Sequence, residues 1–159
     1  FHVPLLINDR VDVALAAGAD GVHVGQPDMA PEDARRLLGP EAIIGLSIKS
    51  VALAEAAPIE LIDYVGIGGV YATTSKDNPN PPSGVDGVRR IVDVFRRRDP
   101  KLPSCAIAGI NAANAGATIA AGADGVSVIS ALSLAPDPTV AATTMRALVD
   151  KALLGRKLQ

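Results

Sequence analysis

The sequence predicts an α/β fold built on a parallel sheet, because short apolar runs alternate with longer segments of helical periodicity. The apolar runs are rich in Val and Ile and lack the polar alternation of a half-exposed strand, which is typical of strands covered on both faces. We expect strands at about residues 3–8, 21–25, 42–47, 63–68, 104–108 and 125–129. Helices are expected at about residues 10–17, 31–38, 50–57, 85–98, 112–121 and 139–154.

A nine-residue repeat favours a barrel over an open sheet. AAGADGVHV begins at Ala16 and AAGADGVSV begins 104 residues later at Ala120, with His23 and Ser127 as the only difference. That spacing corresponds to about four β/α units, which is half of a (β/α)8 TIM barrel. Such a barrel needs roughly 200 to 250 residues, so the 159 residues hold about six of the eight units. We expect residues 1–159 to form one TIM-barrel domain whose first two β/α units would precede Phe1.

Composition excludes several classes of function. The chain is 48% hydrophobic, 20% charged and only 3% aromatic, with a formal net charge of −2, so it lacks the basic surface of a nucleic-acid-binding protein. Cys105 is the only cysteine, which excludes an internal disulfide and a cysteine-based zinc site. No apolar run approaches the ~20 residues of a membrane span. We expect a cytoplasmic protein that acts on small molecules, and the sequence leaves open whether it is a homo-oligomer.

Acidic residues follow the first two predicted strands. Asp9 comes directly after the first strand and Asp28 comes shortly after the second. In a parallel barrel both positions lie on the carboxyl-end face, where ligands bind. Two carboxylates that leave positions open for phosphate oxygens are suited to Mg²⁺. The alternative is that each aspartate caps the helix that follows it.

Later strands lead into segments suited to an anion. Residues 66–76 read GIGGVYATTSK, combining glycines, hydroxyls and Lys76, and they open the long irregular stretch from Gly68 to Gly84. Such a loop can wrap an anion, although a flexible surface loop is the alternative. The last two strands end at AGIN (108–111) and at Ile129 and Ser130, where glycine and backbone amides are suited to a phosphate.

Three further residues receive structural interpretations. Ser47, at the end of the third strand, is by itself better explained as a helix cap. His23 lies within a strand and is expected to pack in the core. Cys105 also lies within a strand, where we expect a small buried hydrophobic residue.

Six segments together resemble the thiamine-phosphate synthase family, whose fold is a (β/α)8 barrel. They follow the family's order along nearly the whole chain: LINDR (6–10), GVHVGQPDM (21–29), GLS (45–47), DYVGIGGVYATTSK (63–76), AGIN (108–111) and GADGVSVIS (122–130). The resemblance implies a transferase that joins 4-amino-5-hydroxymethyl-2-methylpyrimidine diphosphate to a thiazole phosphate. The products are thiamine phosphate and pyrophosphate, and the reaction requires Mg²⁺ and passes through a pyrimidine carbocation.

The resemblance also assigns roles to residues. Asp9 and Asp28 correspond to the metal ligands, and Ser47 and Lys76 to the catalytic residues. The full set of implied substrate contacts is Asn8, Ser47 and Lys76 for the pyrimidine diphosphate, and Thr73, Ser75, Gly109, Ile129 and Ser130 for the thiazole phosphate. No protein nucleophile is needed, because Mg²⁺ and Lys76 would stabilise the charge of the departing diphosphate.

The sequence departs from the family pattern at Gly69, Ser75 and Ala108, where the family usually has Pro, Thr and Gly. The family's basic motif for the pyrimidine diphosphate would lie before Phe1, and without that portion we expect this chain to be inactive alone. Two other functions remain: a related thiazole tautomerase, which needs no paired magnesium carboxylates, and a non-catalytic thiazole-phosphate or thiamine-phosphate binding protein.

Overall fold

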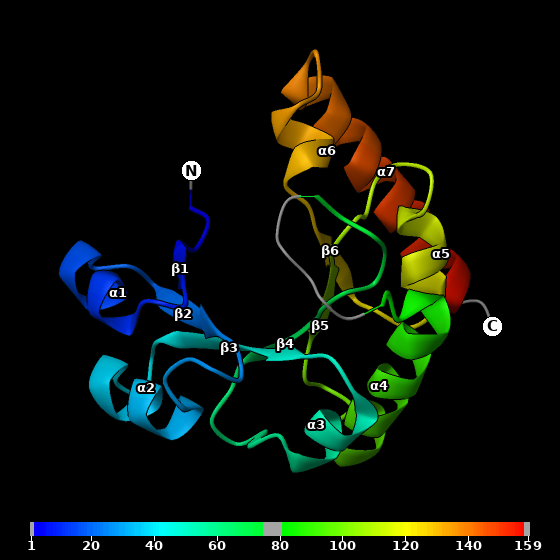
Figure 1. Ribbon diagram of the computed structural model, residues 1–159. Helices are drawn as coiled ribbons and strands as arrows, with labels where there is room; N and C mark the ends of the chain where they lie inside the picture. Colours follow the sequence, from blue (N-terminus) through cyan, green and yellow to red (C-terminus); the bar gives the residue numbers. More distant parts are fainter. Residues whose placement is uncertain (1, 75–80, 158–159) are drawn as a thin grey trace.

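Six parallel strands form one curled sheet with helices on its outer side (Figure 1). The structure is a computed structural model that describes residues 2–74 and 81–157. The strands pair in chain order, and they are β1 (Leu6–Asn8), β2 (Gly21–Val24), β3 (Ile43–Ile48), β4 (Tyr64–Ile67), β5 (Ser104–Ile107) and β6 (Gly125–Ser127). The helices are α1 (Val11–Ala17), α2 (Pro31–Leu38), α3 (Val51–Ala56), α4 (Gly84–Arg98), α5 (Ala115–Ala120), α6 (Ser130–Ser133) and α7 (Pro138–Lys157).

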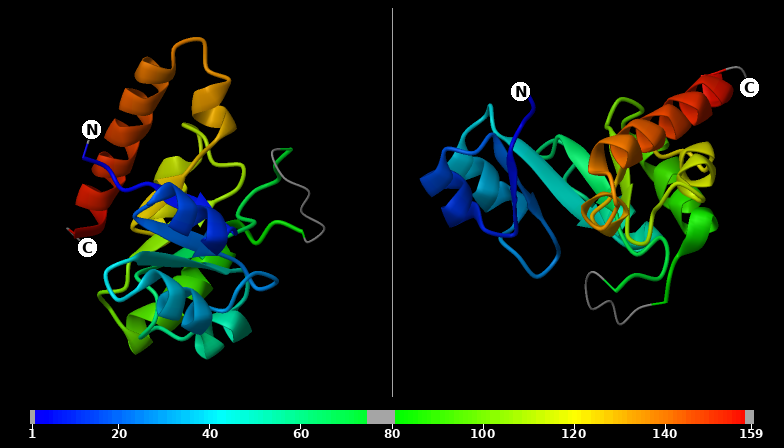
Figure 2. Two further views of the ribbon diagram at one scale, coloured as in Figure 1. Left: turned by 90° about the vertical axis from the view of Figure 1, so that its left-hand side faces the viewer. Right: turned by 90° about the horizontal axis from the view of Figure 1, so that it is seen from above.

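This arrangement confirms the predicted fold class, a parallel α/β sheet curled in the manner of a TIM barrel, with six β/α units. Figure 2 shows the curl from two further directions, with α7 lying along the outside of the molecule. Five strands lie inside their predicted ranges, and β3 is shifted by one residue. The strand β1 begins only at Leu6, because Pro4 has no N–H to donate to a ladder.

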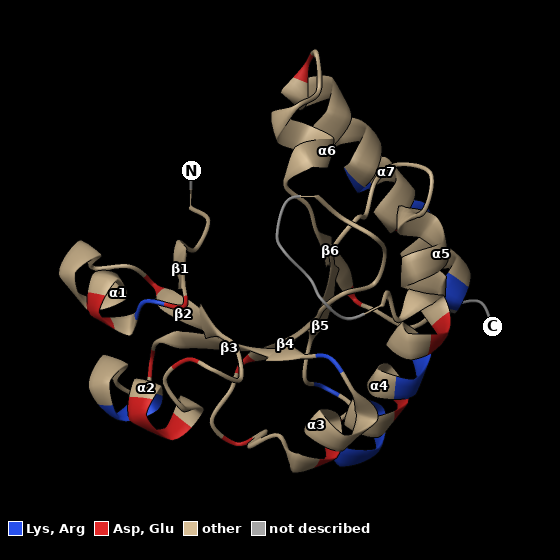
Figure 3. Cartoon of the chain, viewed as in Figure 1, with Lys and Arg blue, Asp and Glu red and all other residues tan. Residues whose placement is uncertain are grey.

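The core lies between the sheet and its outer helices. Alternate residues of the strands point toward the helices and are almost completely buried, among them Val22, Ile44 and Val65. From the helix side, Ile91 and Phe95 of α4 join the same cluster. Lys, Arg, Asp and Glu residues are found mainly in the helices and loops (Figure 3). Within the described residues, no helix is both long enough and apolar enough to cross a membrane.

The repeat has a structural basis at the amino ends of the strands. Asp20, in the first copy, accepts a hydrogen bond from the amide of Leu5 at 2.7 Å. Asp124, at the equivalent position of the second copy, accepts one from the amide of Ser104 at 2.9 Å. Each aspartate therefore ties the start of its own strand to the start of the preceding one. Asp124 also forms ion pairs with Arg96 and Arg156. Burial raises the pKa of Asp124, but the hydrogen bonds from Arg96, Ser104 and Arg156 together outweigh it and lower the pKa.

Two helical features differ from the sequence prediction. The predicted helix at 112–121 begins only at Ala115. The residues before it form a turn in which the amide of Asn111 donates to the Oδ1 atom of Asn114 and the amide of Ala113 donates to the Oδ1 atom of Asn111. The four-residue α6 was not predicted, since SALS is too short to show helical periodicity.

Candidate functional site

The carboxyl ends of β1 and β2 carry the two predicted metal ligands. Asp9 has a positive φ of 64°, and its amide donates to the carbonyl of His23 at 2.8 Å. Asp28 lies in the turn after β2, where its Oδ2 atom accepts the amide of Gly25 at 2.6 Å. Both aspartates are partly buried, and Asn8 is exposed at the end of β1.

Neither aspartate caps a helix. The N-cap residues of α1 and α2 are Arg10 and Ala30, and neither helix receives a side-chain cap. Among the described residues, no hydrogen bond or ion pair reaches the carboxylate of Asp9, and no ion pair reaches that of Asp28. Partly buried carboxylates without a basic partner are suited to a cation. Within the same residues, no cluster of three or more acidic, His or Cys side chains is placed to hold a metal, so a bound Mg²⁺ would take its other ligands from substrate oxygens and water.

Ser47 belongs to this side of the face and does not cap α3. Ser50 performs that role by accepting the amide of Leu53 at 3.2 Å. The Oγ atom of Ser47 instead lies 2.9 Å from the Nε2 atom of His23. The carbonyl of Ser47 accepts the side-chain amide of Gln26 at 3.1 Å, which links β3 to the turn that carries Asp28.

The loop after β4 is held against the loop after β5. The amide of Val70 donates to the carbonyl of Ile107 at 3.2 Å, and that of Tyr71 donates to Ala108 at 3.0 Å. The hydroxyl of Tyr71 lies 3.2 Å from that of Thr118, which is fully buried in α5. Tyr71 therefore ties the beginning of the first loop to both the second loop and its helix.

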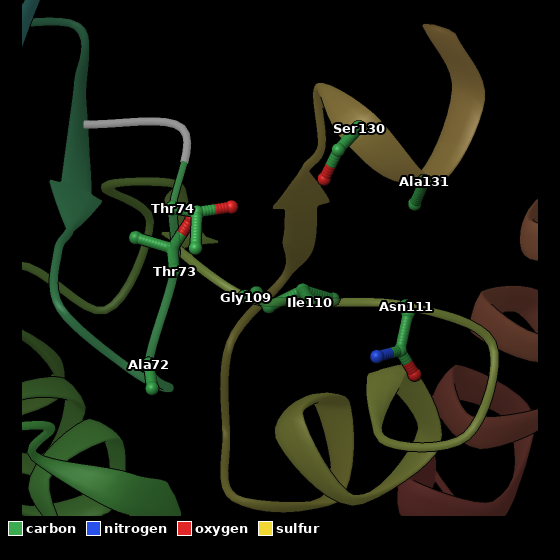
Figure 4. A pocket seen from close by; sticks show the side chains of 8 residues that line it. All are labelled: Ala72, Thr73, Thr74, Gly109, Ile110, Asn111, Ser130 and Ala131. Carbon is green, nitrogen blue, oxygen red and sulfur yellow. The ribbon is translucent and has the colours of Figure 1, made fainter. Parts of the chain in front are cut away.

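A cavity of about 430 Å³ opens between the loops after β4, β5 and β6. Figure 4 shows its walls: Ala72, Thr73 and Thr74 on one side, Gly109, Ile110 and Asn111 below, and Ser130 and Ala131 from α6. The amides of Ser130 and Ala131 belong to the first turn of α6, where a helix offers no carbonyl partner. Hydroxyls, an amide side chain and backbone amides that have no hydrogen-bond partner among the described residues are suited to a phosphate.

Gly109 is required by the close approach of these loops. Its φ is 63°, and a Cβ atom at this position would lie 2.3 Å from the carbonyl oxygen of Ala72 and 2.8 Å from the Cβ of Tyr71. A side chain would therefore push the two walls of the cavity apart. Ala108, which precedes it, has a φ of 89°, a conformation that glycine adopts more readily.

The structure divides the predicted site residues into two groups on one face. Asn8, Asp9, Asp28 and Ser47 lie at the ends of β1 to β3, whereas Thr73, Gly109 and Ser130 line the cavity beside β4 to β6. Ile129 is the N-cap of α6, with its side chain 61% exposed, and is not one of the residues that line the cavity. Ser75 and Lys76 lie outside the described residues.

Sequence reasoning missed part of the site. Asn111 was quoted in a motif but given no role, although it lines the cavity. His23 was expected only to pack, yet it hydrogen-bonds to Ser47 and to the hydroxyl of Tyr64. The difference between His23 and Ser127 in the repeat was the available signal, since one strand carries an imidazole where its counterpart carries a hydroxyl.

The chain is similar in sequence to proteins named thiamine-phosphate synthase. The family profile described as thiamine monophosphate synthase matches residues 1–132. A thiamine-phosphate synthase of Agrobacterium fabrum is 50% identical over 155 residues, which cover 98% of this chain and 70% of that protein. A thiamine-phosphate synthase of Albidiferax ferrireducens is 47% identical over 149 residues, covering 93% and 65%. The chain thus spans about two thirds of the length of these relatives.

A solved structure agrees with the sequence comparisons. The thiamine phosphate pyrophosphorylase of Pyrococcus furiosus superposes with a TM-score of 0.79 at 39% identity, covering 93% of this chain and 68% of that one. The sequence match extends over both groups of site residues, from the aspartates after β1 and β2 to Ser130. The chain therefore belongs to the thiamine monophosphate synthase family.

Proposed function

We propose that the whole protein is a magnesium-dependent, cytoplasmic transferase that joins 4-amino-5-hydroxymethyl-2-methylpyrimidine diphosphate to a thiazole phosphate. The observation that carries this proposal is the separation of two kinds of binding group on one face. Carboxylates that have no basic partner among the described residues follow β1 and β2, and a cavity of about 430 Å³ lies beside β4 to β6. A reaction between two phosphorylated substrates needs both kinds of group.

The carboxylate side is suited to the diphosphate. Asp9 and Asp28 would hold Mg²⁺, because their oxygens are hard ligands and lack competing cations among the described residues. When bound, Mg²⁺ would neutralise negative charge on the departing diphosphate. We assign Asn8 and Ser47 to contacts with the same substrate, and Lys76 to the diphosphate.

The cavity side is suited to the thiazole phosphate. Gly109 lets the loops that form the cavity approach each other closely, and the first turn of α6 offers the amides of Ser130 and Ala131. Thr73 adds a hydroxyl from the opposite wall. We also assign Ser75 and Ile129 to this phosphate.

The proposed reaction breaks one bond and forms one bond, and neither step needs a nucleophile from the protein. The bond between the pyrimidine methylene carbon and the diphosphate oxygen breaks, and its electron pair leaves with pyrophosphate. The methylene carbon becomes cationic, and the lone pair of the thiazole nitrogen then forms the new C–N bond. The residues of the protein therefore bind and orient the two substrates and exclude water from the cation.

A thiazole tautomerase is less well supported, because that reaction gives no role to the carboxylates of Asp9 and Asp28. A non-catalytic thiazole-phosphate binding protein would likewise need only the cavity. Titration calorimetry separates these functions. For the synthase we expect pyrimidine diphosphate to bind only when Mg²⁺ is present, while thiazole phosphate binds with or without it. Equal affinity for the pyrimidine diphosphate with and without Mg²⁺ would contradict the proposal.

A matched pair of variants sharpens this test. Asp9→Asn removes one charge from the proposed metal site, and Asp33→Asn removes one from the exposed first turn of α2, where Asp33 pairs with Arg36. We expect the first variant to lose Mg²⁺-dependent binding and the second to retain it. If both variants lose the same amount of Mg²⁺-dependent binding, the effect comes from the net charge of the protein and not from a metal site at Asp9.

A further inference from the structure

A hydrogen-bonded group lies on the inner face of the sheet beneath the proposed diphosphate site. His23 lies on β2, Ser47 on β3 and Tyr64 on β4. His23 and Tyr64 are both in register with Gly45 of β3, which lies between them. A Cβ atom at Gly45 would lie 2.2 Å from the Cζ atom of Tyr64 and 2.4 Å from the Nδ1 atom of His23. The two rings therefore occupy space that only glycine leaves open.

A second glycine supports the same ring. A Cβ atom at Gly66 would lie 2.7 Å from the Cε1 atom of His23. The ring centroids of His23 and Tyr64 are 5.4 Å apart. The imidazole is thus enclosed by neighbouring strands, which limits the rotamers it can adopt and fixes the direction of its two nitrogens.

The imidazole joins two hydroxyls. Its Nδ1 atom lies 2.8 Å from the hydroxyl of Tyr64, and its Nε2 atom lies 2.9 Å from the Oγ atom of Ser47. A neutral imidazole has one N–H donor and one acceptor, whereas each hydroxyl can do either. The hydrogen bonds can therefore run in one of two directions, from Tyr64 to Ser47 or the reverse.

The surroundings of the two hydroxyls select one direction. Among the described residues, the hydroxyl of Tyr64 has no hydrogen-bond partner other than His23. If Tyr64 accepted from Nδ1, its own proton would have no protein acceptor there, which carries a cost in a partly buried group. Burial raises the pKa of Tyr64 to about 12, so the phenol keeps this proton. Ser47 lies at the carboxyl end of its strand, where a ligand or water can accept its proton.

We infer that His23 and Tyr64 are positioning residues that fix the hydroxyl of Ser47 as a hydrogen-bond donor toward the pyrimidine diphosphate. Tyr64 donates to Nδ1, the Nε2–H group donates to Ser47, and the proton of Ser47 points to an acceptor atom of the substrate. The identity of that substrate rests on the proposed function, whereas the direction of the hydrogen bonds rests on the fold alone.

The tautomer of His23 can be observed directly. The chain has two histidines, and His2 is exposed near the start, so His2→Gln leaves one imidazole to observe. Long-range ¹H–¹⁵N correlation spectra distinguish a protonated ring nitrogen from an unprotonated one. We expect the Nε2–H tautomer in this background without ligand, and loss of that preference when Tyr64→Phe is added. An Nδ1–H tautomer in the background protein would overturn the inference, whatever the activity of the protein.

Steady-state kinetics of the whole protein test the functional half. Tyr64→Phe removes one hydroxyl, and we expect the KM for pyrimidine diphosphate to rise roughly 3- to 10-fold, as for loss of one hydrogen bond, with the KM for thiazole phosphate unchanged. His23→Gln keeps an N–H donor and should retain more of the affinity than His23→Leu. Equal increases in both KM values, or identical behaviour of the two His23 variants, would show a merely structural role.

The other tyrosine provides the matched comparison. Tyr71→Phe also removes one phenol hydroxyl, but that hydroxyl bonds to Thr118 beside the thiazole-phosphate cavity. We expect the KM for thiazole phosphate to rise in this variant and that for pyrimidine diphosphate to stay unchanged. If both tyrosine variants raise the KM for the same substrate, the inference that Tyr64 positions Ser47 is wrong.

Discussion

Gly109→Ala should destabilise the protein more than the same substitution at Gly18, although both glycines have nearly the same backbone conformation. The φ angles are 63° and 61°. At Gly18, the C-cap of α1, a Cβ atom would meet nothing within 4 Å. At Gly109 it would lie 2.3 Å from the carbonyl oxygen of Ala72. The pair therefore separates the cost of the conformation from the cost of the contact.

The expected magnitudes follow from these two costs. Alanine in the left-handed region costs about 1 to 2 kcal/mol, which applies to both variants. At Gly109 the backbone of Ala72 must also move, and overpacking of this kind adds roughly 1 to 3 kcal/mol. The free energy of unfolding should therefore fall by about 1 kcal/mol more, at least, in Gly109→Ala than in Gly18→Ala.

Urea denaturation followed by circular dichroism measures both values, provided that the m-values of the variants agree. Gly109→Ala should also weaken the binding of thiazole phosphate, because Ala72 forms one wall of the cavity, whereas Gly18→Ala should not. Equal destabilisation of the two variants would refute the reasoning, since it would show that the contact with Ala72 relaxes at no cost.

Three further predictions concern single side chains. Asp28→Asn keeps an oxygen to accept the amide of Gly25 but removes the charge, and kcat/KM measured at saturating Mg²⁺ should fall about 100-fold or more; near-normal turnover would exclude Asp28 as a metal ligand. Ala108 has a φ of 89°, which glycine adopts without strain, so Ala108→Gly should raise the free energy of unfolding by about 1 kcal/mol and raise the urea midpoint with it. A lower midpoint would show that the residue is unstrained. Burial raises the pKa of Asp124, but the hydrogen bonds from Arg96, Ser104 and Arg156 together outweigh it and lower the pKa, so the stability that Asp124 contributes is present at neutral pH and is lost as the pH falls below about 4. Unfolding free energies of the parent should therefore fall more steeply between about pH 5 and 3 than those of Asp124→Asn, and parallel curves would contradict this.

The strands were predictable because they are short runs that are apolar at most positions, although only the residues that face the helices are almost completely buried. Runs such as Ile43 to Ile48 are apolar at most positions, and their lengths suit strands and not helices. The ends of the helices were less predictable, since they depend on local hydrogen bonds. The turn before α5 is held by side-chain hydrogen bonds, from the amide of Asn111 to Asn114 and from the amide of Ala113 to Asn111, and such local bonds leave no periodic pattern in the sequence.

Only those site residues that lie at or shortly after the end of a strand could be predicted from the sequence. Asp9 follows β1 directly and Asp28 lies in the turn after β2, so topology alone brings them to one face. The role of His23 was hidden, because its partners Ser47 and Tyr64 lie 24 and 41 residues away in the sequence. Their meeting depends on the register of three strands and on the glycines between them, and no local pattern encodes that register.

The strictly sequential order of the strands has a consequence for how the chain folds. Each strand from β2 to β5 pairs only with its predecessor and its successor in the sequence. Loop closure therefore spans one β/α unit at a time, and structure can propagate along the chain from unit to unit, as in repeat proteins. Amide hydrogen exchange should then be slow in the central strands β3 and β4, each of which pairs with two neighbouring strands.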